Sequence, residues 1–258
     1  MSENYNKNLI EIEDLGTKTV FDILKKKNSN KLKIYKKILL ILIKMQKIKI
    51  KKIKNFKKKF YKIPIYSKSL LFEEVNLFFK WYVPHIFNKK KRFKINSQLR
   101  KVISSLLKKI KLPNNTFVHR DFHVSNLMLK KRIISVIDSQ DAVYGNIAYD
   151  LASLIDDVRL RTSKNMKEMI YKEYLYLNKK KINIKKFKND FDILSVLRNL
   201  KIIGIFTRLA NRDNKKQYLK LIPHAWELIE LRIKNNYIFK DLKKNLETNF
   251  PKKIRIKK

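Results

Sequence analysis

Residues 116–138 interrupt a chain whose apolar residues otherwise follow helical spacing. Apolar side chains three and four positions apart are typical of amphipathic helices. This spacing predicts helices over residues 71–82, 99–110, 151–160, 194–210 and 221–233. Residues 116–118, 127–129 and 133–137 instead form short apolar runs, and Lys130 and Lys131 supply a turn between the last two. We therefore expect an α+β fold that is mainly helical and carries a β-hairpin.

The chain has a very large net charge, but this charge excludes fewer functions than its magnitude suggests. Lys and Arg number 63 against 22 Asp and Glu, a net charge of +41, which is typical of nucleic-acid-binding proteins. However, 52 of these cations are lysine and only three residues are glycine, a bias that A- and T-rich codons produce. The lysines are also dispersed along the chain. We therefore do not expect nucleic acid as the partner, although a basic nucleic-acid-binding protein stays as an alternative.

Composition also excludes several kinds of site and location. Cysteine is absent, which excludes disulfides, thiolate metal ligands and a cysteine nucleophile. The longest aliphatic run, residues 38–43, is far shorter than the roughly 18 residues that indicate a membrane span. The first residues do not have the basic and apolar regions of a secretory signal. We expect a cytoplasmic protein without a membrane partner.

One window of the sequence escapes the lysine bias. Between His119 and Asp157 there are six aspartates and four basic residues, so this window is negative within a strongly positive chain. Carboxylates gathered in a cationic protein have two common explanations: they cap helices and turns, or they hold a hard cation such as Mg²⁺.

The spacing inside the window favours the second explanation. His119, Arg120 and Asp121 are followed by four residues and then Asn126, and Asp138 comes twelve residues later. This spacing is typical of phosphoryl transfer in kinase-like folds, where one Asp orients the acceptor hydroxyl and an Asn and a second Asp bind metal. Mg²⁺ prefers carboxylate and amide oxygens, which these side chains provide.

The run HRDFHVSNLMLKKRIISVIDSQDAVYGNIAYDLASLIDD resembles the aminoglycoside phosphotransferase family. It is particularly similar to the bacterial N-acetylmuramate/N-acetylglucosamine anomeric kinases, which act on recycled cell-wall amino sugars. The segments IEIEDLGTKT, LFEEVNLFFKWYVP and NLKIIGIFTRLANRDNKKQYLKLIP also resemble family segments. The resemblance implies a protein-kinase-like C-terminal lobe with a catalytic β-hairpin, an amino-sugar substrate, and ATP and Mg²⁺ as cofactors.

The resemblance also assigns roles to individual residues. It implies that Asp121 is the catalytic base, with His119 and Arg120 as supports of the catalytic loop, and that Asn126 and Asp138 bind Mg²⁺. It places Glu11, Glu13 and Asp14 in a hinge strand beside ATP. Substrate contacts are expected from Asp141, Asp156 and Arg208.

Several of these positions have a structural alternative. Asp150 is expected to anchor the catalytic loop from a helix start rather than to act in catalysis. His119 is expected to pack and to donate or accept hydrogen bonds. Asp156 and Asp157 are either helix-surface charges or substrate contacts. For Arg208 a solvated helix end competes with the acceptor pocket.

The chain departs from the family pattern before residue 8. A complete family member carries a nucleotide lobe there, with a phosphate-covering loop and a strand lysine. We expect residues 1–16 to be a remnant of that lobe and hinge, residues 17–245 the phosphotransferase lobe, and residues 246–258 a basic tail. Impaired activity, a partner chain or oligomer over the uncovered surface, and a pseudoenzyme that binds a partner are expectations that follow from this departure.

Overall fold

The computed structural model of the protein describes residues 2–4, 7, 9–26, 30–54, 57–178 and 182–256. Its helices are α1 (Val20–Leu24), α2 (Lys31–Gln46), α3 (Lys68–Leu77), α4 (Val83–Ile86), α5 (Lys89–Lys108), α6 (Tyr149–Ile155), α7 (Lys164–Leu177), α8 (Ile184–Arg212), α9 (Ile222–Ile233), α10 (Lys240–Asn249) and α11 (Lys252–Arg255). Its strands are β1 (Ser2–Asn4), β2 (Leu9–Glu11), β3 (Lys52–Lys54), β4 (Phe60–Lys62), β5 (Asn114–Val118), β6 (Leu127–Lys130), β7 (Ile133–Val136) and β8 (Val143–Asn146). A π-helical segment, Phe78–Tyr82, joins α3 to α4.

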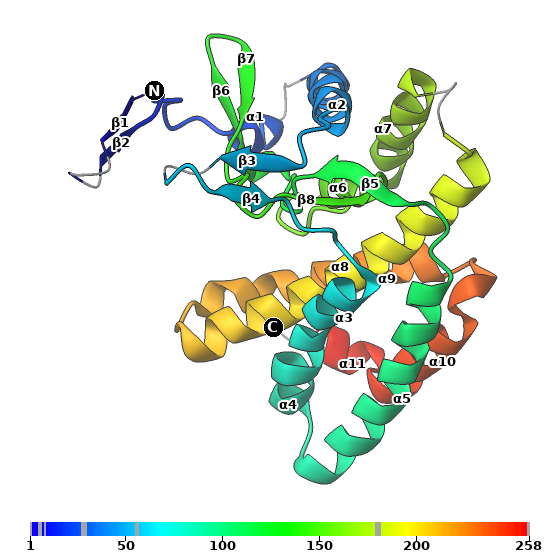
Figure 1. The fold of residues 1–258 in the computed structure, drawn as a ribbon. Helices are drawn as coiled ribbons and strands as arrows, with labels where there is room; N and C mark the ends of the chain where they lie inside the picture. Colours follow the sequence, from blue (N-terminus) through cyan, green and yellow to red (C-terminus); the bar gives the residue numbers. More distant parts are fainter. Residues whose placement is uncertain are drawn as a thin grey trace.

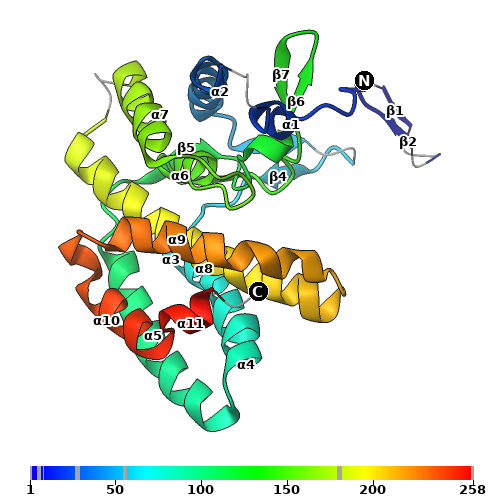
Figure 2. The same cartoon turned by 180° about the vertical axis from the view of Figure 1, so that it is seen from behind.

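The strands form two-stranded antiparallel sheets, in the pairs β1–β2, β3–β4, β5–β8 and β6–β7. They lie with α1, α2, α6 and α7 in one part of the molecule, and α3, α4, α5, α10 and α11 form the other part (Figures 1 and 2). Helix α8 runs between the two parts and packs on α3, α6 and α9. The fold is therefore α+β and mainly helical, as the sequence predicts.

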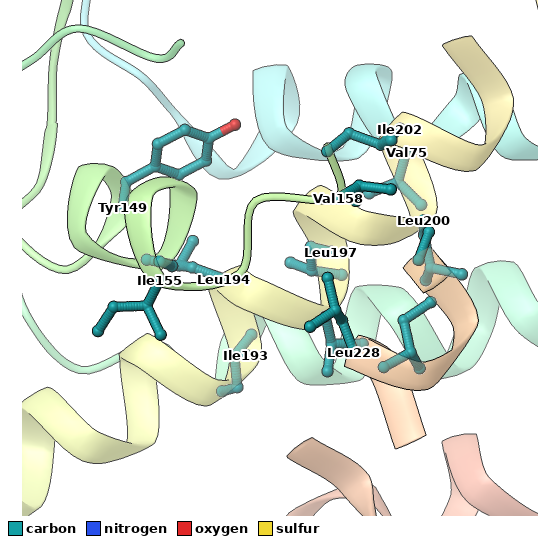
Figure 3. Close-up of a cluster of buried hydrophobic side chains, with 14 of the residues drawn as sticks. Val75, Tyr149, Ile155, Val158, Ile193, Leu194, Leu197, Leu200, Ile202 and Leu228 are labelled. Carbon is teal, nitrogen blue, oxygen red and sulfur yellow. The ribbon is translucent and has the colours of Figure 1, made fainter. Parts of the chain in front are cut away.

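Helix α8 supplies the centre of the hydrophobic core. Its Leu194, Leu197 and Leu200 meet side chains of α3, α6 and α9, among them Val75 and Leu228 (Figure 3). The crossing with α3 is close because position 204 is glycine. A Cβ atom there would lie 2.3 Å from the backbone carbonyl carbon of Leu77, so no other residue fits without moving a helix.

The predicted elements match the structure best where they are buried. The strands at 116–118, 127–129 and 133–137 are present, and the helix predicted over residues 194–210 is the inner part of the longer α8. The β3–β4 hairpin was not predicted, and both of its strands are exposed along their length. The lysine cluster at residues 179–181 lies outside the described residues.

The helix predicted over residues 151–160 ends earlier, at Ile155. The Asp157 carboxylate explains the early end, since its Oδ1 accepts a hydrogen bond from the backbone N–H of Arg159 at 3.0 Å. A side chain that bonds the backbone two residues on competes with helical hydrogen bonding. This turn leads the chain out of α6 beside the catalytic loop.

Part of the segment expected to be a basic tail, residues 246–258, packs against the hydrophobic core. Leu246 and Phe250 are completely buried, and the Phe250 ring lies 5.5 Å from that of Trp226. Tyr82 belongs to the same aromatic cluster and is buried in the core. The division of the chain at residues 16 and 245 stays a prediction. Among the described residues, no helix has the length and hydropathy needed to cross a membrane.

Candidate active site

The β6–β7 hairpin brings Asn126 and Asp138 together. Leu127 pairs with Val136 at the open end of the hairpin, and the backbone N–H of Ile137 donates to the Asn126 carbonyl at 3.1 Å. Asn126 and Asp138 therefore flank the two strands, and the Asn126 Nδ2 atom donates to Asp138 Oδ2 at 3.3 Å. The spacing of twelve residues in the sequence is the length of this hairpin.

The turn at the other end of the hairpin explains why the two strands form at all. Lys131 and Arg132 both have positive φ angles, 46° and 68°. Two successive residues in that region make the two-residue turn whose twist suits an antiparallel hairpin. The Lys130-Lys131 turn predicted from the sequence is therefore confirmed, displaced by one residue.

Asp121 lies on the loop that precedes the hairpin, next to the same two residues. Its backbone carbonyl accepts hydrogen bonds from Asn126 Nδ2 at 3.0 Å and from the His123 N–H at 3.0 Å. The Asp121 side chain is half-buried, and the Asp138 side chain is exposed. The structure thus brings together the three residues expected to act on phosphate, metal and acceptor.

Two residues of this site have left-handed backbone conformations. Arg120 has φ of 73° and Asp138 has φ of 69°. Such conformations cost non-glycine residues roughly 1–3 kcal/mol, and they persist where surrounding contacts impose them. One strained position thus directly precedes Asp121, and the other is the expected metal ligand Asp138 itself.

The Asp150 carboxylate makes the contacts that impose the conformation of the catalytic loop. Its carboxylate accepts the backbone N–H groups of His119 at 2.7 Å and Arg120 at 3.1 Å, and its residue is 1% exposed. Burial raises the pKa of Asp150 to about 7, against the opposing effect of these two donors. The expectation that Asp150 anchors the loop is confirmed.

His119 has a similar supporting position. Its Nε2 atom lies 2.9 Å from the carbonyl oxygen of Ile137, just before Asp138, so the ring joins the loop to the hairpin. Burial lowers the pKa of His119, and the Ile137 carbonyl partly opposes the shift. A neutral, buried ring suits a structural link better than a proton-transfer group.

Arg120 is held by a buried charge cluster under the loop. Its Nη2 binds Glu74 of α3, and Glu74 also binds Lys201 of α8 at 2.9 Å. Burial would raise the pKa of Glu74, yet Lys201, Tyr66 and Arg120 hold it below its usual range. The cluster ties the catalytic loop to the two helices that cross at Gly204.

Glu74 and Lys201 are functional neighbours that the sequence analysis missed. Each is a charged residue inside an apolar helical run, which is an unusual place for an unpaired charge. That signal could have identified both residues, although not that they bind each other.

The predicted substrate residues fall in different places. Asp141 lies at the site, since its carbonyl accepts Arg120 Nη1 at 3.2 Å and its side chain is exposed. Arg208 lies on α8 two turns beyond Lys201, half-buried. Asp156 corrects the prediction: it is 0% exposed, and Lys167, Ser195 and Arg232 occupy both of its carboxylate oxygens, so neither oxygen is left for an acceptor.

Two of the three predicted hinge residues contact the β6–β7 hairpin. Lys130 Nζ of β6 donates to Glu13 Oε1 at 3.3 Å and to the Asp14 carbonyl at 2.5 Å, whereas Glu11 belongs to β2. The Asp14 Oδ1 atom accepts the N–H of Gly16 at 2.7 Å, which forms a turn after these residues. A role for Glu11, Glu13 and Asp14 in binding ATP stays a prediction.

The donor set fits a hard cation. Asp138 offers an exposed carboxylate, and Asn126 uses its Nδ2 atom for two hydrogen bonds, which leaves Oδ1 for a metal. These oxygen ligands suit Mg²⁺, which usually binds one or two protein groups, substrate phosphates and water. In the part of the chain that the structure describes, no cluster of three or more His, Cys, Asp or Glu residues could hold a metal alone.

Residues 63–180, which include all three residues, match the model of the phosphotransferase enzyme family. The matched segment is less than half of the chain. The fold agrees, because the structure is similar to that of Plasmodium vivax ethanolamine kinase, with a TM-score of 0.53 over 88% of this chain and 69% of that chain. The two share 16% sequence identity, so this likeness concerns the fold alone.

Sequence relatives narrow the family further. The chain is 32% identical over 166 residues to the N-acetylmuramate/N-acetylglucosamine kinase of Neisseria meningitidis, covering 62% of this chain and 50% of that protein. It is 26% identical over 241 residues to the Pseudomonas aeruginosa protein of the same name, covering 90% of this chain and 67% of that protein. The chain thus spans half to two thirds of the length of these relatives. The phosphotransferase resemblance found in the sequence is confirmed.

Proposed function

We propose that the protein is an ATP-dependent phosphotransferase that acts on a hydroxyl group of an amino sugar. The observation that carries the proposal is the grouping of Asp121, Asn126 and Asp138 at the open end of one hairpin, on a loop fixed by buried Asp150. Phosphoryl transfer requires this combination, since its transition state is stabilised mostly by positioning and by charge neutralisation.

Each residue has a distinct task in this proposal. Asp121 orients the acceptor hydroxyl and accepts its proton as the oxygen attacks the γ-phosphate. Asp138 and Asn126 Oδ1 hold Mg²⁺, which neutralises charge on the nucleotide phosphates when bound. Arg120, tied to Glu74, keeps the loop in its strained conformation so that these groups are positioned before substrate arrives.

The amino-sugar acceptor is supported by the relatives and not by the geometry of the loop. Both named relatives carry N-acetylmuramate and N-acetylglucosamine in their names. A cytoplasmic location, where ATP is available, fits this function. Weak turnover by this chain, a pseudoenzyme role and nucleic-acid binding stay predictions that the same experiments separate.

The experiment is a kinase assay on the purified chain with a panel of acceptors. N-acetylglucosamine and N-acetylmuramate are compared with kanamycin, choline and a serine peptide at fixed Mg·ATP. We expect an amino sugar to be phosphorylated in preference. Phosphorylation of the peptide and of no sugar would contradict the proposal, and RNA affinity that falls steeply with salt would favour nucleic-acid binding.

Variants then test the three residues. Asp138→Asn is expected to abolish turnover while the fold is kept, because a neutral amide is a poor ligand for Mg²⁺. Asp241→Asn is the matched control, since Asp241 is exposed in the first turn of α10. Binding of Mn²⁺, followed by electron paramagnetic resonance, provides a readout besides activity and should weaken in Asp138→Asn alone. Equal turnover of Asp138→Asn and wild type would exclude the assignment.

A further inference from the structure

Three buried polar side chains beside the catalytic loop each carry an atom without a hydrogen-bond partner among the described residues. The atoms are Nδ1 of His123, Oδ2 of Asp157 and Nη1 of Arg198. The three residues are 6%, 2% and 4% exposed. Polar atoms as buried as these nearly always have a partner, so the three require an explanation.

The three residues belong to one neighbourhood although they come from separate elements. His123 follows Asp121 by two residues, Asp157 begins the turn after α6, and Arg198 lies on α8 one turn before Lys201. The charges of Arg159, Asp157 and Arg198 all act on the His123 ring, so these side chains lie near one another.

The neighbourhood reaches the surface beside the site. Arg159, whose Nη1 atom is 3.7 Å from Asp157 Oδ1, has a side chain that is 30% exposed. Asp121, on the loop that carries His123, is half-buried. His123 also donates its backbone N–H to the Asp121 carbonyl at 3.0 Å, which joins this neighbourhood to the catalytic loop.

Comparison with other buried charged side chains shows what is unusual about these three residues. Arg232 binds Asp156 with two nitrogens at 2.7 and 3.0 Å, and Arg255 binds Glu230 at 2.6 Å. Asp156 and Asp157 are adjacent and equally buried, yet Asp156 has both oxygens bound and Asp157 has one oxygen free. Arg159 pairs with Asp157 Oδ1, but Oδ2 has no partner, and a buried polar atom without one is destabilising unless a ligand completes it.

Arginine itself is informative in this chain. Only 11 of its 63 basic residues are arginine, against the strong bias toward lysine. The planar guanidinium provides donors in a fixed arrangement that an ammonium group lacks. Position 198 therefore keeps the side chain that is best suited to directed hydrogen bonds.

The chemistry of the cluster selects the kind of ligand. Arg198 donates, Asp157 accepts, and a neutral His123 does either, so the cluster offers both roles side by side. A cationic acceptor would face the Arg198 and Arg159 charges, and an anionic group would face the Asp157 carboxylate. Hydroxyl and acetamido groups, which are neutral and both donate and accept, match the set.

We propose that His123, Asp157 and Arg198 form the acceptor subsite, where they bind the neutral hydroxyl and acetamido groups of the sugar and set specificity. This inference rests on the proposed function, adds His123 and Arg198, which the sequence analysis did not consider for it, and chooses between Asp156 and Asp157. Asp157, rather than the neighbouring Asp156, is the substrate carboxylate. The three residues hold the ring so that one hydroxyl lies at Asp121.

The test measures acceptor and nucleotide kinetics separately in Asp157→Asn and Arg198→Lys. Loss of one hydrogen bond to a charged group typically weakens binding about tenfold to a hundredfold. We expect the KM for N-acetylglucosamine to rise by that factor in both variants while the KM for ATP changes less than twofold. Asp241→Asn should leave both constants unchanged, because Asp241 lies on α10, away from the loop.

Deoxy sugars identify the partner group on the ligand. Wild type should discriminate against one analogue of N-acetylglucosamine that lacks a single hydroxyl, and Asp157→Asn should lose that discrimination. A purely structural carboxylate would lower the melting temperature and kcat without changing the ratio of the two sugars. Calorimetric titration of N-acetylglucosamine into each variant, without nucleotide, gives a readout that does not depend on turnover.

The outcomes separate the two proposals. Wild type that binds and phosphorylates N-acetylglucosamine, with variants whose KM and deoxy discrimination are unchanged, overturns the subsite and leaves the proposed function. Wild type that neither binds nor phosphorylates an amino sugar overturns the proposed function and the subsite with it. Loss of sugar affinity confined to Asp157→Asn and Arg198→Lys, with folding intact, supports both.

Discussion

Helix α6 carries a buried aspartate at each end, and the two ends differ in what binds the carboxylate. Asp150, in its first turn, accepts two backbone N–H groups of the catalytic loop. Asp156, at its C-terminal cap, is bound by the cations of Lys167 and Arg232 and by the Ser195 hydroxyl. Both carboxylates are completely or almost completely buried.

Equal burial gives opposite pKa shifts at the two ends. Burial raises the pKa of Asp150 to about 7, because neutral donors only partly replace the lost water. Burial acts the same way on Asp156, yet the charges of Arg232 and Lys167 hold its pKa well below the usual range. The comparison shows that partners, rather than depth, decide the charge of a buried carboxylate. One end holds a loop in place for chemistry, and the other fastens the helices together.

The largest loss of stability is expected from removing the charge of Asp156, at the end of α6 that is fastened to other helices. Asp156→Asn removes the ion-pair partner of buried Lys167 and leaves Arg232 with only Asp192 at 4.0 Å, and breaking a buried pair typically costs about 3–5 kcal/mol. Urea unfolding at pH 7 measures the loss. Arg232→Lys, which keeps the charge and loses the second nitrogen, should cost less. If Asp156→Asn were as stable as wild type, the structural assignment of Asp156 would be wrong.

Substitution of Asp150, at the end of α6 that holds the catalytic loop, is expected to cost less stability than Asp156→Asn and to reduce turnover more. Asp150→Asn keeps one oxygen acceptor and replaces the other with a donor that faces a backbone N–H, at a cost of about 1–3 kcal/mol. The loop that carries Asp121 is then no longer held, so kcat should fall at least tenfold while the variant stays folded. Parallel measurement of unfolding and kcat distinguishes this from Asp156→Asn, whose folded fraction should keep its turnover.

The pH dependence of stability should have opposite signs at the two ends. The folded protein keeps a proton on Asp150 that the unfolded chain, with a pKa near 3.8, has lost. The contribution of Asp150 is therefore fullest below about pH 4 and declines as pH rises to about 7. Asp156 contributes above about pH 4, and its contribution is lost as pH falls through its lowered folded pKa.

Three histidines also change stability in this pH range, so their contribution to the unfolding free energy must be subtracted. Burial lowers the pKa values of His119, His123 and His224, so they add stability as pH rises toward 6.5. The measurement is thus the difference in unfolding free energy between wild type and Asp150→Asn from pH 4 to 7. That difference should fall steadily with pH. A difference that rises with pH would mean that Asp150 is ionised throughout.

A contrast between local contacts and contacts made by tertiary packing explains how much of the molecule can be predicted from the sequence. The strands and the grouping of Asn126 with Asp138 follow from a local hairpin, so the spacing of twelve residues was enough to expect them. Asp150 was also recognisable, because it opens a helix near the loop. By contrast, the sequence left both Asp156 and Asp157 open as substrate contacts, since the partners that fasten Asp156 come from α7, α8 and α9. No local pattern separates two adjacent aspartates whose partners are brought by tertiary packing.

The smallest effect is expected for an ion pair of similar geometry on the surface. Arg161 binds Glu227 with two nitrogens at 2.6 and 3.1 Å, much as Arg232 binds Asp156, but the two side chains are 66% and 53% exposed. Water and salt screen such a pair, and exposed pairs contribute about 0–1 kcal/mol. Arg161→Gln should therefore shift the urea midpoint slightly, and the shift should vanish in 1 M salt. A loss comparable to that of Asp156→Asn would show that the fork geometry, rather than burial, sets the strength of these pairs. The comparison between the ends of α6 would then need a different cause.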